Sequence, residues 1–440
     1  MDLLTTTASA SPSRAYVLVS NAGKCTRLPL SSPATIPTTV DRQTLNTAYH
    51  VTIPANLIQP GNEVSVVFDD DQGRTANEAD KTYRVFRLPV RSSITETIRV
   101  IPITYKGQNG FVSSNTGLAS FMVRLLPITA FTLTTEAAFA PPSLNQSVLG
   151  LLGTGQESFV TMQAVLSELD DECARRNGSQ SSARTAPKCL GVFPNNLTFR
   201  TATGQVVGIA YVGGVSMLTQ SVSATDVFSQ LSPYGTSHWL DFRALTVAHE
   251  YGHLMNLNHA GCGGPTDTDP RLYPDGRLGG GSGYDTAREF YFSSQRLNNS
   301  GQPQFGDLMS YCTKEWSSDR SYLAALGYRS GASARVETNS TGGRSQWLKI
   351  SLQGERWSLR PVDFTPSTLR VTEATLNASS SQGVTSLPVY AAVIADAPEL
   401  THGPFYVDLG DLNPQSLSLH GLESLLDKTI QWSAQEWIKR

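Results

Sequence analysis

Three histidines and one glutamate fall within eleven residues of the sequence, at a spacing that suits metal-assisted hydrolysis. His249 and His253 are four residues apart, so on a helix both imidazoles leave the same face and can bind one cation. Glu250 would project beside them toward a water molecule on that cation. Zinc lowers the pKa of such a water toward about 7, and a glutamate can then take its proton. A catalytic zinc needs three protein ligands, and His259 is the candidate for the third.

The position of His259 requires the chain to leave the helix after His253. In a continuous helix of about 3.6 residues per turn, His259 would lie about 240° around the axis from His253 and would face away from the metal. Asn256 lies between them, and Asn tolerates a positive φ better than most residues with a side chain. We therefore predict that the helix ends in a left-handed turn at Asn256.

An HExxH pattern also occurs on polar helix faces that bind nothing, so its context decides between the two interpretations. Phe242, Leu245 and Val247, which precede the pattern, predict an apolar and therefore buried helix. Three of the seven histidines of the chain gather here, and burying three imidazoles without a metal would be costly. The context favours a site for one catalytic zinc ion.

Residues 249–259 read HExxHxxNxxH, which resembles the HExxHxxGxxH signature of the metzincin zinc endopeptidases. The one departure is Asn256 at the usual glycine, which is compatible with the same turn. Metzincins also carry a methionine-containing turn below the zinc. The resemblance places Met309, in the segment 307–312, as this apolar floor rather than as a ligand. In some metzincins a tyrosine two residues further on stabilises the oxyanion, and Tyr311 has that spacing. The alternative for Tyr311 is a core aromatic with a satisfied hydroxyl.

The resemblance covers about residues 98–330 and implies the places of three further elements. The helical periodicity over 157–176 would be the backing helix of the family, and 319–326 the helix after the methionine turn, with Ser318 as its cap. Residues 208–214 would lie near the edge strand that pairs with an extended substrate in metzincins. The glycine-rich acidic loop after the third histidine is similar to that of secreted bacterial metzincins.

Five cysteines in 440 residues exclude a small disulfide scaffold but leave room for one or two bridges. If the metzincin geometry applies, Cys262 and Cys312 lie close to the zinc site and a bridge between them is expected. The alternative is two buried free thiols, as in a cytosolic protein. Cys173 and Cys189 flank a polar segment, so a second bridge is expected there, and Cys25 is left unpaired.

Two other groups of polar residues carry less information. Oxygen-rich loops can bind calcium, but the aspartates of the acidic loop match no fixed ligand spacing, so solvated turns are favoured over a calcium site. These aspartates are Asp267, Asp269, Asp275 and Asp285. The remaining histidines are scattered and are interpreted as structural: His50, His238, His402 and His420.

Composition excludes several classes of protein. The 34 Lys and Arg residues against 37 Asp and Glu give a net charge of −3, without the basic excess that nucleic-acid binding requires. No apolar run approaches the roughly 18 residues of a transmembrane helix. The first residues lack the pattern of a signal peptide, so the protein is either cytosolic or has lost an export signal. Abundant Ser, Thr, Gly and Asn favour a secreted or extracellular protein, and we expect a monomer.

The order of the expected elements predicts an α+β chain with a metzincin-like zinc protease domain between two β-sandwich-like domains. Residues 1–14 are small and polar and are expected to be disordered. Short strands separated by turn residues indicate a β-sandwich-like domain over 15–97. The protease domain would span 98–332, and a second β-rich domain 333–440.

These observations predict a zinc-dependent endopeptidase that hydrolyses peptide bonds of proteins, with Glu250 activating the zinc-bound water. Two alternatives stay open: a peptidase directed at mucin-type glycoproteins, and a binding or adhesion protein with a vestigial protease domain. The intact Glu250 argues against the second, because a binding scaffold needs no general base. No P-loop and no G-x-S-x-G elbow occurs, so nucleotide binding and serine hydrolysis lack support. Substrate choice depends on pocket shape, which one sequence does not give.

Overall fold

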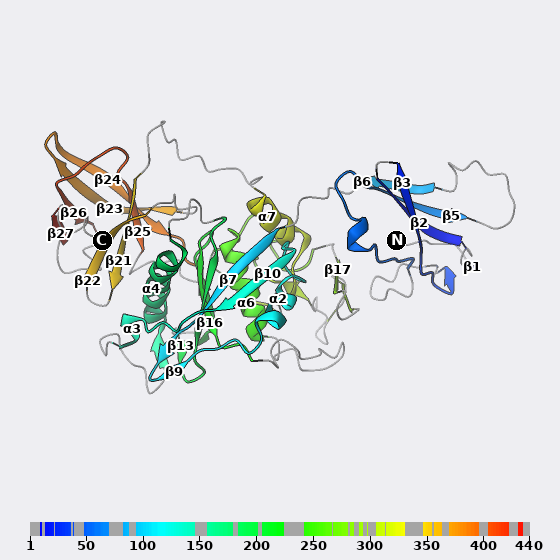
Figure 1. Cartoon of the computed structure of the whole chain (residues 1–440), viewed down its shortest axis with the longest axis horizontal. Coiled ribbons are helices and arrows are strands. Elements are labelled where there is room, and N and C mark those ends of the chain that lie inside the picture. The colour runs from blue at the N-terminus through cyan, green and yellow to red at the C-terminus, as the bar shows by residue number, and fades with distance from the viewer. Residues whose placement is uncertain are drawn as a thin grey trace. The chain divides into compact units, whose positions relative to one another are not determined.

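The structure is a computed structural model of a mixed α/β chain with mostly strands and few helices among its described residues (Figure 1). The described residues are 9–10, 14–21, 23–36, 38, 48–69, 82–87, 94–145, 156–178, 184–200, 205–223, 242–265, 267–279, 282–285, 290–293, 297, 305–312, 314–330, 346–353, 356–362, 369–395, 404–421 and 430–433. His238, His402 and residues 1–8 and 11–13 lie outside them. The chain divides into two compact units, Met1–Ile94 with Ser282–Gln304, and Thr95–Gly281 with Phe305–Arg440.

The first unit is built on an antiparallel sheet of four strands, in the order β3-β2-β5-β6. Alternate apolar residues of β2 and β5 form its core, with Val17 and Val64 among them, as expected for strands with one buried face. Ser9 and Ala10 pair with a short strand near residue 36, so this part of the segment predicted to be disordered is ordered by main-chain pairing. The elements are β1 (Ser9–Ala10), β2 (Arg14–Asn21), β3 (Lys24–Pro29), β4 (Thr35–Ile36), η2 (Ala55–Leu57), β5 (Glu63–Asp69), β6 (Thr82–Arg87), β17 (Ser282–Asp285) and β18 (Phe290–Ser293).

A five-stranded sheet, in the order β10-β7-β12-β16-β15, forms the centre of the second unit. Its strands pair in parallel except β15, which runs antiparallel to β16 and ends the described order. Residues 208–210 therefore form an edge strand, as the resemblance implied. The strands are β7 (Thr95–Pro102), β10 (Ala130–Thr135), β12 (Lys188–Phe193), β15 (Gly208–Ala210) and β16 (Ser216–Gln220).

Two helices, α4 (Phe159–Asn177) and α6 (Phe242–Leu254), cover opposite faces of this sheet. A Cβ on Gly191 of β12 would meet the Leu169 side chain of α4 at 2.7 Å, whereas one on Gly208 of β15 would meet α6. In the register of the sheet, Gly191 lies beside Leu218, and Leu218 lies beside Ile209, so these three residues share one face. Neighbouring residues of a strand point to opposite faces, so Gly208 points to the other one. The absence of a side chain at both glycines lets the helices approach the sheet closely.

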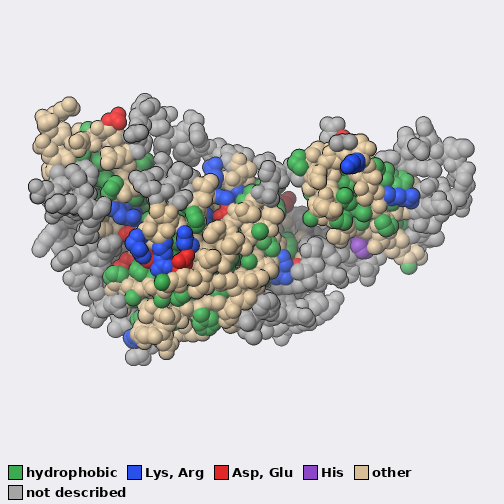
Figure 2. Space-filling view, in the orientation of Figure 1, with side chains coloured by type: hydrophobic (Ala, Val, Ile, Leu, Met, Phe, Trp, Pro, Cys, Tyr) green, Lys and Arg blue, Asp and Glu red, His purple; other side chains and the backbone are tan. Residues whose placement is uncertain are grey.

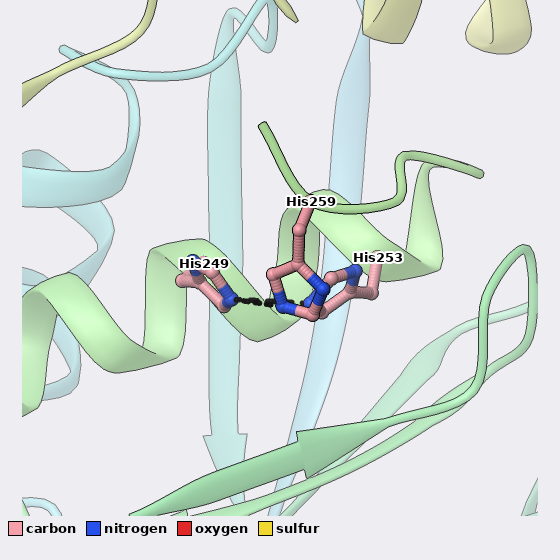
Figure 3. A group of neighbouring side chains, drawn as sticks. All are labelled: His249, His253 and His259. Carbon is pink, nitrogen blue, oxygen red and sulfur yellow. Dashed lines mark hydrogen bonds between the residues drawn. The ribbon is translucent and has the colours of Figure 1, made fainter. Parts of the chain in front are cut away.

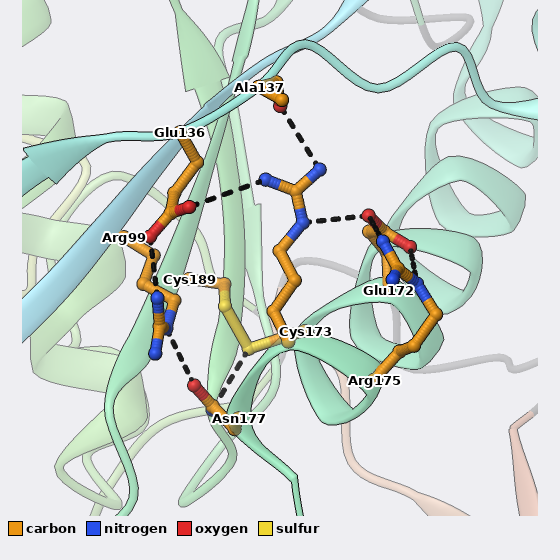
Figure 4. Close-up of polar contacts among 9 residues, drawn as sticks. Arg99, Glu136, Ala137, Glu172, Cys173, Arg175, Asn177 and Cys189 are labelled. Atoms are coloured by element: carbon orange, nitrogen blue, oxygen red, sulfur yellow. Dashed lines mark hydrogen bonds and ion pairs between the residues drawn. A yellow bond between two sulfur atoms is a disulfide. The ribbon is translucent and has the colours of Figure 1, made fainter.

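Helix α4 is tied to the sheet by a disulfide, by a hydrogen bond from Arg99, and by the ion pair of Arg176 with Glu136 (Figure 4). Cys173, near the end of α4, is bonded to Cys189 at the start of β12, which confirms the predicted bridge. Beside it, Arg99 of β7 donates to Asn177 and to Glu136, at 2.9 and 2.5 Å. Figure 4 shows these groups arranged around the disulfide, so the end of α4 is fixed to strands distant in the sequence.

The charge on the surface is mixed rather than of one sign. On the face in Figure 2, basic and acidic side chains lie side by side over the part that contains α4. Ion pairs on that helix join Glu172 to Arg175 and Arg176. Among the described residues, no helix has the length and apolar character needed to cross a membrane.

The remaining elements of the second unit include a sheet of seven strands near the end of the chain, in the order β22-β21-β25-β24-β23-β26-β27. These strands are β21 (Trp347–Gln353), β22 (Arg356–Val362), β23 (Leu369–Ser380), β24 (Gly383–Ala392), β25 (Phe405–Asp408), β26 (Ser416–His420) and β27 (Ile430–Ser433). The shorter elements are β8 (Thr104–Tyr105), β9 (Gln108–Asn109), α2 (Asn115–Met122), α3 (Pro142–Asn145), β11 (Gln156–Ser158), β13 (Thr198–Arg200), β14 (Gln205–Val206), β19 (Gly306–Asp307), β20 (Lys314–Trp316) and α7 (Asp319–Arg329).

Buried charges and apolar side chains join this last sheet to the rest of the unit. Lys349 of β21 is fully buried and donates to Asp170 and Asp171 of α4, at 2.5 and 2.6 Å. Trp347 and Tyr406 of the sheet pack in the same apolar cluster as residues of α4 and β12. The C-terminal sheet is therefore part of one folded unit with the central sheet.

Candidate active site

Helix α6 carries the first three residues of the predicted site, and it is buried on all sides between residues 244 and 254. Ala244, Leu245 and Ala248 favour a helix and pack into the interior. His249, Glu250 and His253 are the ionisable members of the predicted site in this buried stretch and are at most 2% exposed, so their groups need partners within the protein or a bound ion.

The helix ends in a left-handed turn at Asn256, whose φ is 64°. The amide of Asn256 donates to the carbonyl of His253 at 2.8 Å, and the amide of Leu257 donates to that of Gly252 at 3.3 Å. These two bonds form a Schellman motif, which satisfies the last carbonyls of a helix. The predicted turn is confirmed, and it brings His259 back toward the helix.

The three imidazoles converge on one point (Figure 3). The Nε2 atom of His249 lies 3.1 Å from that of His253 and 3.3 Å from that of His259. Ligand atoms of the three residues all lie within 4.8 Å of one another, and each side chain is buried. In Figure 3, His249 and His253 come from α6 and His259 from the loop beyond it, so the ring nitrogens face a common position between them.

Each histidine has an acceptor on its other ring nitrogen. The Nδ1 of His249 lies 2.6 Å from the carbonyl oxygen of Leu308, and that of His253 lies 2.7 Å from the carbonyl oxygen of Leu257. These acceptors hold the proton on Nδ1 and leave the Nε2 lone pairs facing one another. Such an arrangement is stable only when a cation or protons separate the three lone pairs, so the site suits a metal ion.

Asp267 provides the third of these acceptors, with its Oδ1 2.5 Å from Nδ1 of His259. Main-chain hydrogen bonds support the contact. The amide of His259 donates to the carbonyl of Asp267 at 3.2 Å, and the amide of Asp269 donates to the carbonyl of His259 at 2.8 Å. In the sequence Asp267 was one of four aspartates in a glycine-rich loop, with no signal that it meets the third histidine. This contact follows from loop folding alone.

Met309 lies beneath the histidines in a tight turn, as the resemblance implied. The amide of Ser310 donates to the carbonyl of Asp307 at 2.9 Å, which closes the turn. The Met309 sulfur lies 2.4 Å from the place of a Cβ on Gly252, so the glycine between the two helix histidines leaves room for the methionine. Since Leu308 also accepts from His249, this turn positions one histidine directly.

Asp307, which sequence analysis did not single out, holds the methionine turn to helix α7. Its buried carboxylate accepts from the amide of Met309 at 2.7 Å, from the amide of Ser318 at 2.9 Å, and from the hydroxyl of Ser321. Burial raises the pKa of this carboxyl, although these hydrogen bonds act in the opposite direction. Ser318 also caps α7 as predicted, by accepting from the Ser321 amide.

Residues 163–260 of the chain match the reprolysin-like family M12B of metallo-peptidases. This match ends just beyond the third histidine, so it includes α6 and the whole histidine cluster. The chain contains a metzincin-type metallopeptidase domain. No curated protein matches the sequence. A solved structure of catalytic inactive OgpA from Akkermansia muciniphila, in complex with an O-glycopeptide substrate, is similar at 10% identity and a TM-score of 0.27. The match covers 79% of this chain and 94% of that one, but such a TM-score is too low to indicate a shared fold.

Glu250 of the metallopeptidase domain lies against the edge strand β15. A Cβ on Gly208 would meet the Glu250 Oε1 atom at 2.4 Å and the Thr246 methyl group at 2.7 Å. A larger residue at position 208 would therefore displace the carboxylate. The position of the Glu250 carboxylate therefore depends on a glycine at position 208, which the sequence alone did not reveal.

Tyr311 borders the histidines and is 41% exposed, which rules out a fully buried core role. Its ring centroid is 4.5 Å from that of His259, and its amide donates to the carbonyl of Cys262 at 3.0 Å. Cys262 is bonded to Cys312, so the second predicted disulfide is confirmed and joins the loop after His259 to the methionine turn. Cys25 is the free, exposed cysteine.

A group of buried charges lies behind the catalytic helix of the metallopeptidase domain. Glu96 of β7 is paired with Arg329 of α7. Burial raises the pKa of Glu96, while Arg329 and Lys188 oppose this change. Burial also lowers the pKa of Lys188 to about 7, against the attraction of Glu96. Burial raises the pKa of the Tyr251 hydroxyl on α6, and the charge of Glu96 raises it further.

Two further aspartates of the acidic loop, Asp269 and Asp275, serve local structure. Asp269 is buried and forms an ion pair with Arg271, and it also accepts from the amide of Asn258 at 3.2 Å. Asp275 accepts from the amide of Arg277 at 3.1 Å. The histidine triplet is the one metal-binding group found among the described residues.

Proposed function

We propose that the protein is a zinc endopeptidase, with the ion held by His249, His253 and His259. The observation that carries the proposal is the convergence of three Nε2 atoms whose Nδ1 partners are all fixed. Zn–N distances of about 2.0–2.1 Å in tetrahedral geometry separate two ligand nitrogens by roughly 3.3–3.4 Å. The observed separations of 3.1 and 3.3 Å fit this geometry. Three imidazoles with an open fourth position are typical of catalytic zinc.

Glu250 is proposed as the general base. A zinc ion bound by the histidines would supply the Lewis acid that polarises the scissile carbonyl and acidifies a water molecule. Glu250 would take the proton of that water during attack and deliver it to the amine that leaves. Glu250 follows His249 directly on the helix, and its carboxylate lies against Gly208.

Tyr311 is proposed to donate a hydrogen bond to the oxyanion that forms at the scissile carbonyl. Its ring stands next to His259, and the residue is partly exposed beside the histidines. Replacing it with Phe should lower kcat by roughly 10- to 100-fold, less than the 10²–10³ of a fully enclosed oxyanion donor. Steady-state kinetics test this, and an unchanged kcat with a raised KM would assign Tyr311 to substrate binding alone.

Asp267 is proposed to orient His259 and to raise its affinity for the metal. Loss of such an outer carboxylate costs about 10- to 100-fold in metal affinity. The Asp267→Asn variant should therefore bind zinc more weakly by that factor, as measured by competition with a chromophoric chelator. Asp275→Asn is the matched control, because Asp275 lies in the same loop and, among the described residues, accepts from the Arg277 amide rather than from a histidine. Equal zinc affinity in the two variants would contradict the role of Asp267.

We further propose that an extended peptide pairs with β15. The flanking β-rich regions, 15–97 and 333–440, are proposed to be β-sandwich-like accessory domains. We also propose that the protein is secreted and monomeric. The two disulfides are compatible with an extracellular enzyme. A vestigial, binding-only domain is disfavoured by the complete set of three histidines, glutamate and fixed Nδ1 partners.

The decisive experiment is metal analysis of the purified protein, together with a peptidase assay on mixed peptide libraries. We expect one zinc per chain, loss of hydrolysis on treatment with a strong chelator, and recovery on adding zinc. Peptides with and without an O-glycan at the same Ser or Thr should be included, because they separate a general endopeptidase from one directed at glycoproteins. Absence of stoichiometric zinc from a folded sample would refute the proposal.

A further inference from the structure

We propose that the C-terminal sheet closes one end of the substrate groove by pairing with the edge strand, which limits main-chain recognition on the N-terminal side of the scissile bond. The inference rests on the proposed peptidase function. It concerns residues 393–395, which follow directly after strand β24, and residues 210–212 at the end of β15.

The hydrogen bonds of β15 show which of its groups face outward. The carbonyl of Val207 accepts from Gln220, and the amide of Tyr211 donates to Ser216, so both groups point toward β16. Main-chain groups in a strand alternate in direction, so those of Gly208, Ala210 and Val212 point to the open edge. This edge is where an added strand can pair.

Part of that edge is already occupied. The amide of Ala395 donates to the carbonyl of Ala210 at 3.0 Å, and the amide of Val212 donates to the carbonyl of Val393 at 3.0 Å. These bonds flank an antiparallel bridge between Tyr211 and Ile394. The segment 393–395 thus adds a short strand to β15 in the manner expected of a bound peptide.

The pairing segment is held firmly in place. Ile394 and Ala395 are 2% and 0% exposed, and Ile394 packs in the same apolar cluster as Tyr211 and Ile209. The buried contact of Lys349 with Asp170 fixes the sheet from which the segment extends. Displacing the segment would expose apolar surface and unpair buried main-chain groups, so a substrate peptide cannot easily replace it.

The open part of the edge lies next to the proposed general base. Gly208 contacts the Glu250 carboxylate, so the scissile bond of a paired peptide would lie close to Gly208. A peptide antiparallel to β15 runs with its N-terminal side toward residues 210–212. One residue opposite Gly208 and a second opposite Ile209 fit before the peptide meets Ala395. Residues further toward the N-terminus of the substrate must leave the edge.

The test is a series of peptides with one mapped cleavage site, lengthened one residue at a time on the N-terminal side of the scissile bond. We expect kcat/KM to rise up to the second residue and then to stay level. Two further main-chain hydrogen bonds would be expected to raise it by roughly tenfold or more. Such a rise between the second and fifth residues would overturn the inference. If no peptide of the mixed library is cleaved, so that no cleavage site can be mapped, the proposed function is refuted instead.

A pair of variants locates the cause of the limit. Ala395→Pro removes the amide that donates to Ala210, whereas the matched control Ala395→Gly keeps it. With the proline, kcat/KM should rise with length beyond the second residue, and with the glycine it should stay level. A level profile in a folded proline variant would assign the limit to another element and contradict the proposal. If the proline variant does not fold, the length series of the unmodified protein decides.

Discussion

Replacing Glu250 with Gln is expected to lower kcat by about 10²- to 10⁴-fold while fold and zinc content stay unchanged. Gln keeps the volume of the side chain, which matters because the carboxylate lies close against Gly208. It removes the ability to accept a proton at neutral pH, which is the step proposed for this residue. The metal ligands are untouched, so a zinc measurement should give the same stoichiometry as the unmodified protein.

A control at a distant glutamate separates this effect from a general response to Glu→Gln substitution. Glu172 on α4 pairs with Arg175 and Arg176 and lies on a helix on the opposite face of the central sheet. Glu172→Gln should keep kcat close to that of the unmodified protein. Full activity in the Glu250→Gln variant would eliminate the proposed general base, whatever the state of the metal.

The sequence predicted those parts of the site that lie on helix α6 and in the turn that follows it. His249, Glu250 and His253 are positioned by helical periodicity, and the turn at Asn256 follows from the need to return His259 to the same face. Met309 came from the resemblance to a known family rather than from spacing. These positions could be predicted because local geometry, or the turn found in the family that the sequence resembles, determines each of them.

The residues that sequence analysis missed act through contacts between distant segments. Asp267 meets His259 only because two loop segments pair in register, and Asp307 connects a turn to the start of α7. The closure of β15 by residues 393–395 joins segments that are nearly 200 residues apart in the chain. No periodicity or composition marks such pairs, because neither partner has an unusual pattern of its own.

In the C-terminal region, too, the sequence predicted local structure but not the contacts between distant segments. Strands of the C-terminal region were expected from their alternation, but their attachment to the central unit was not. Lys349 lies in an apolar strand pattern where a buried cation would be unexpected, and its partners lie on a helix predicted for the protease domain. The attachment therefore depends on a charge pairing that only the folded chain reveals.

Replacing Lys349 with Ala should destabilise the second unit by about 3–5 kcal/mol, since it leaves buried carboxylates without their main cation. Asp170 is 5% exposed and would retain only the Ser216 hydroxyl, whereas Asp171 would keep Arg360. The loss should appear as a lower midpoint in chemical denaturation, and as a lower Tm. Lys24→Ala, at an exposed position of the first unit, should change stability by no more than about 0.5 kcal/mol.

A double variant, Lys349→Met with Asp170→Asn, distinguishes an uncompensated charge from lost packing. Removing the charges of Lys349 and Asp170 should restore much of the stability, because a neutral Asn needs no counter-ion and Asp171 keeps Arg360. If the double variant is as unstable as Lys349→Ala, packing of the lysine stem rather than its charge holds the sheet to α4. The distinction bears on the substrate groove as well. The sheet that Lys349 attaches to α4 carries residues 393–395, so loosening it by either route should also release the edge of β15.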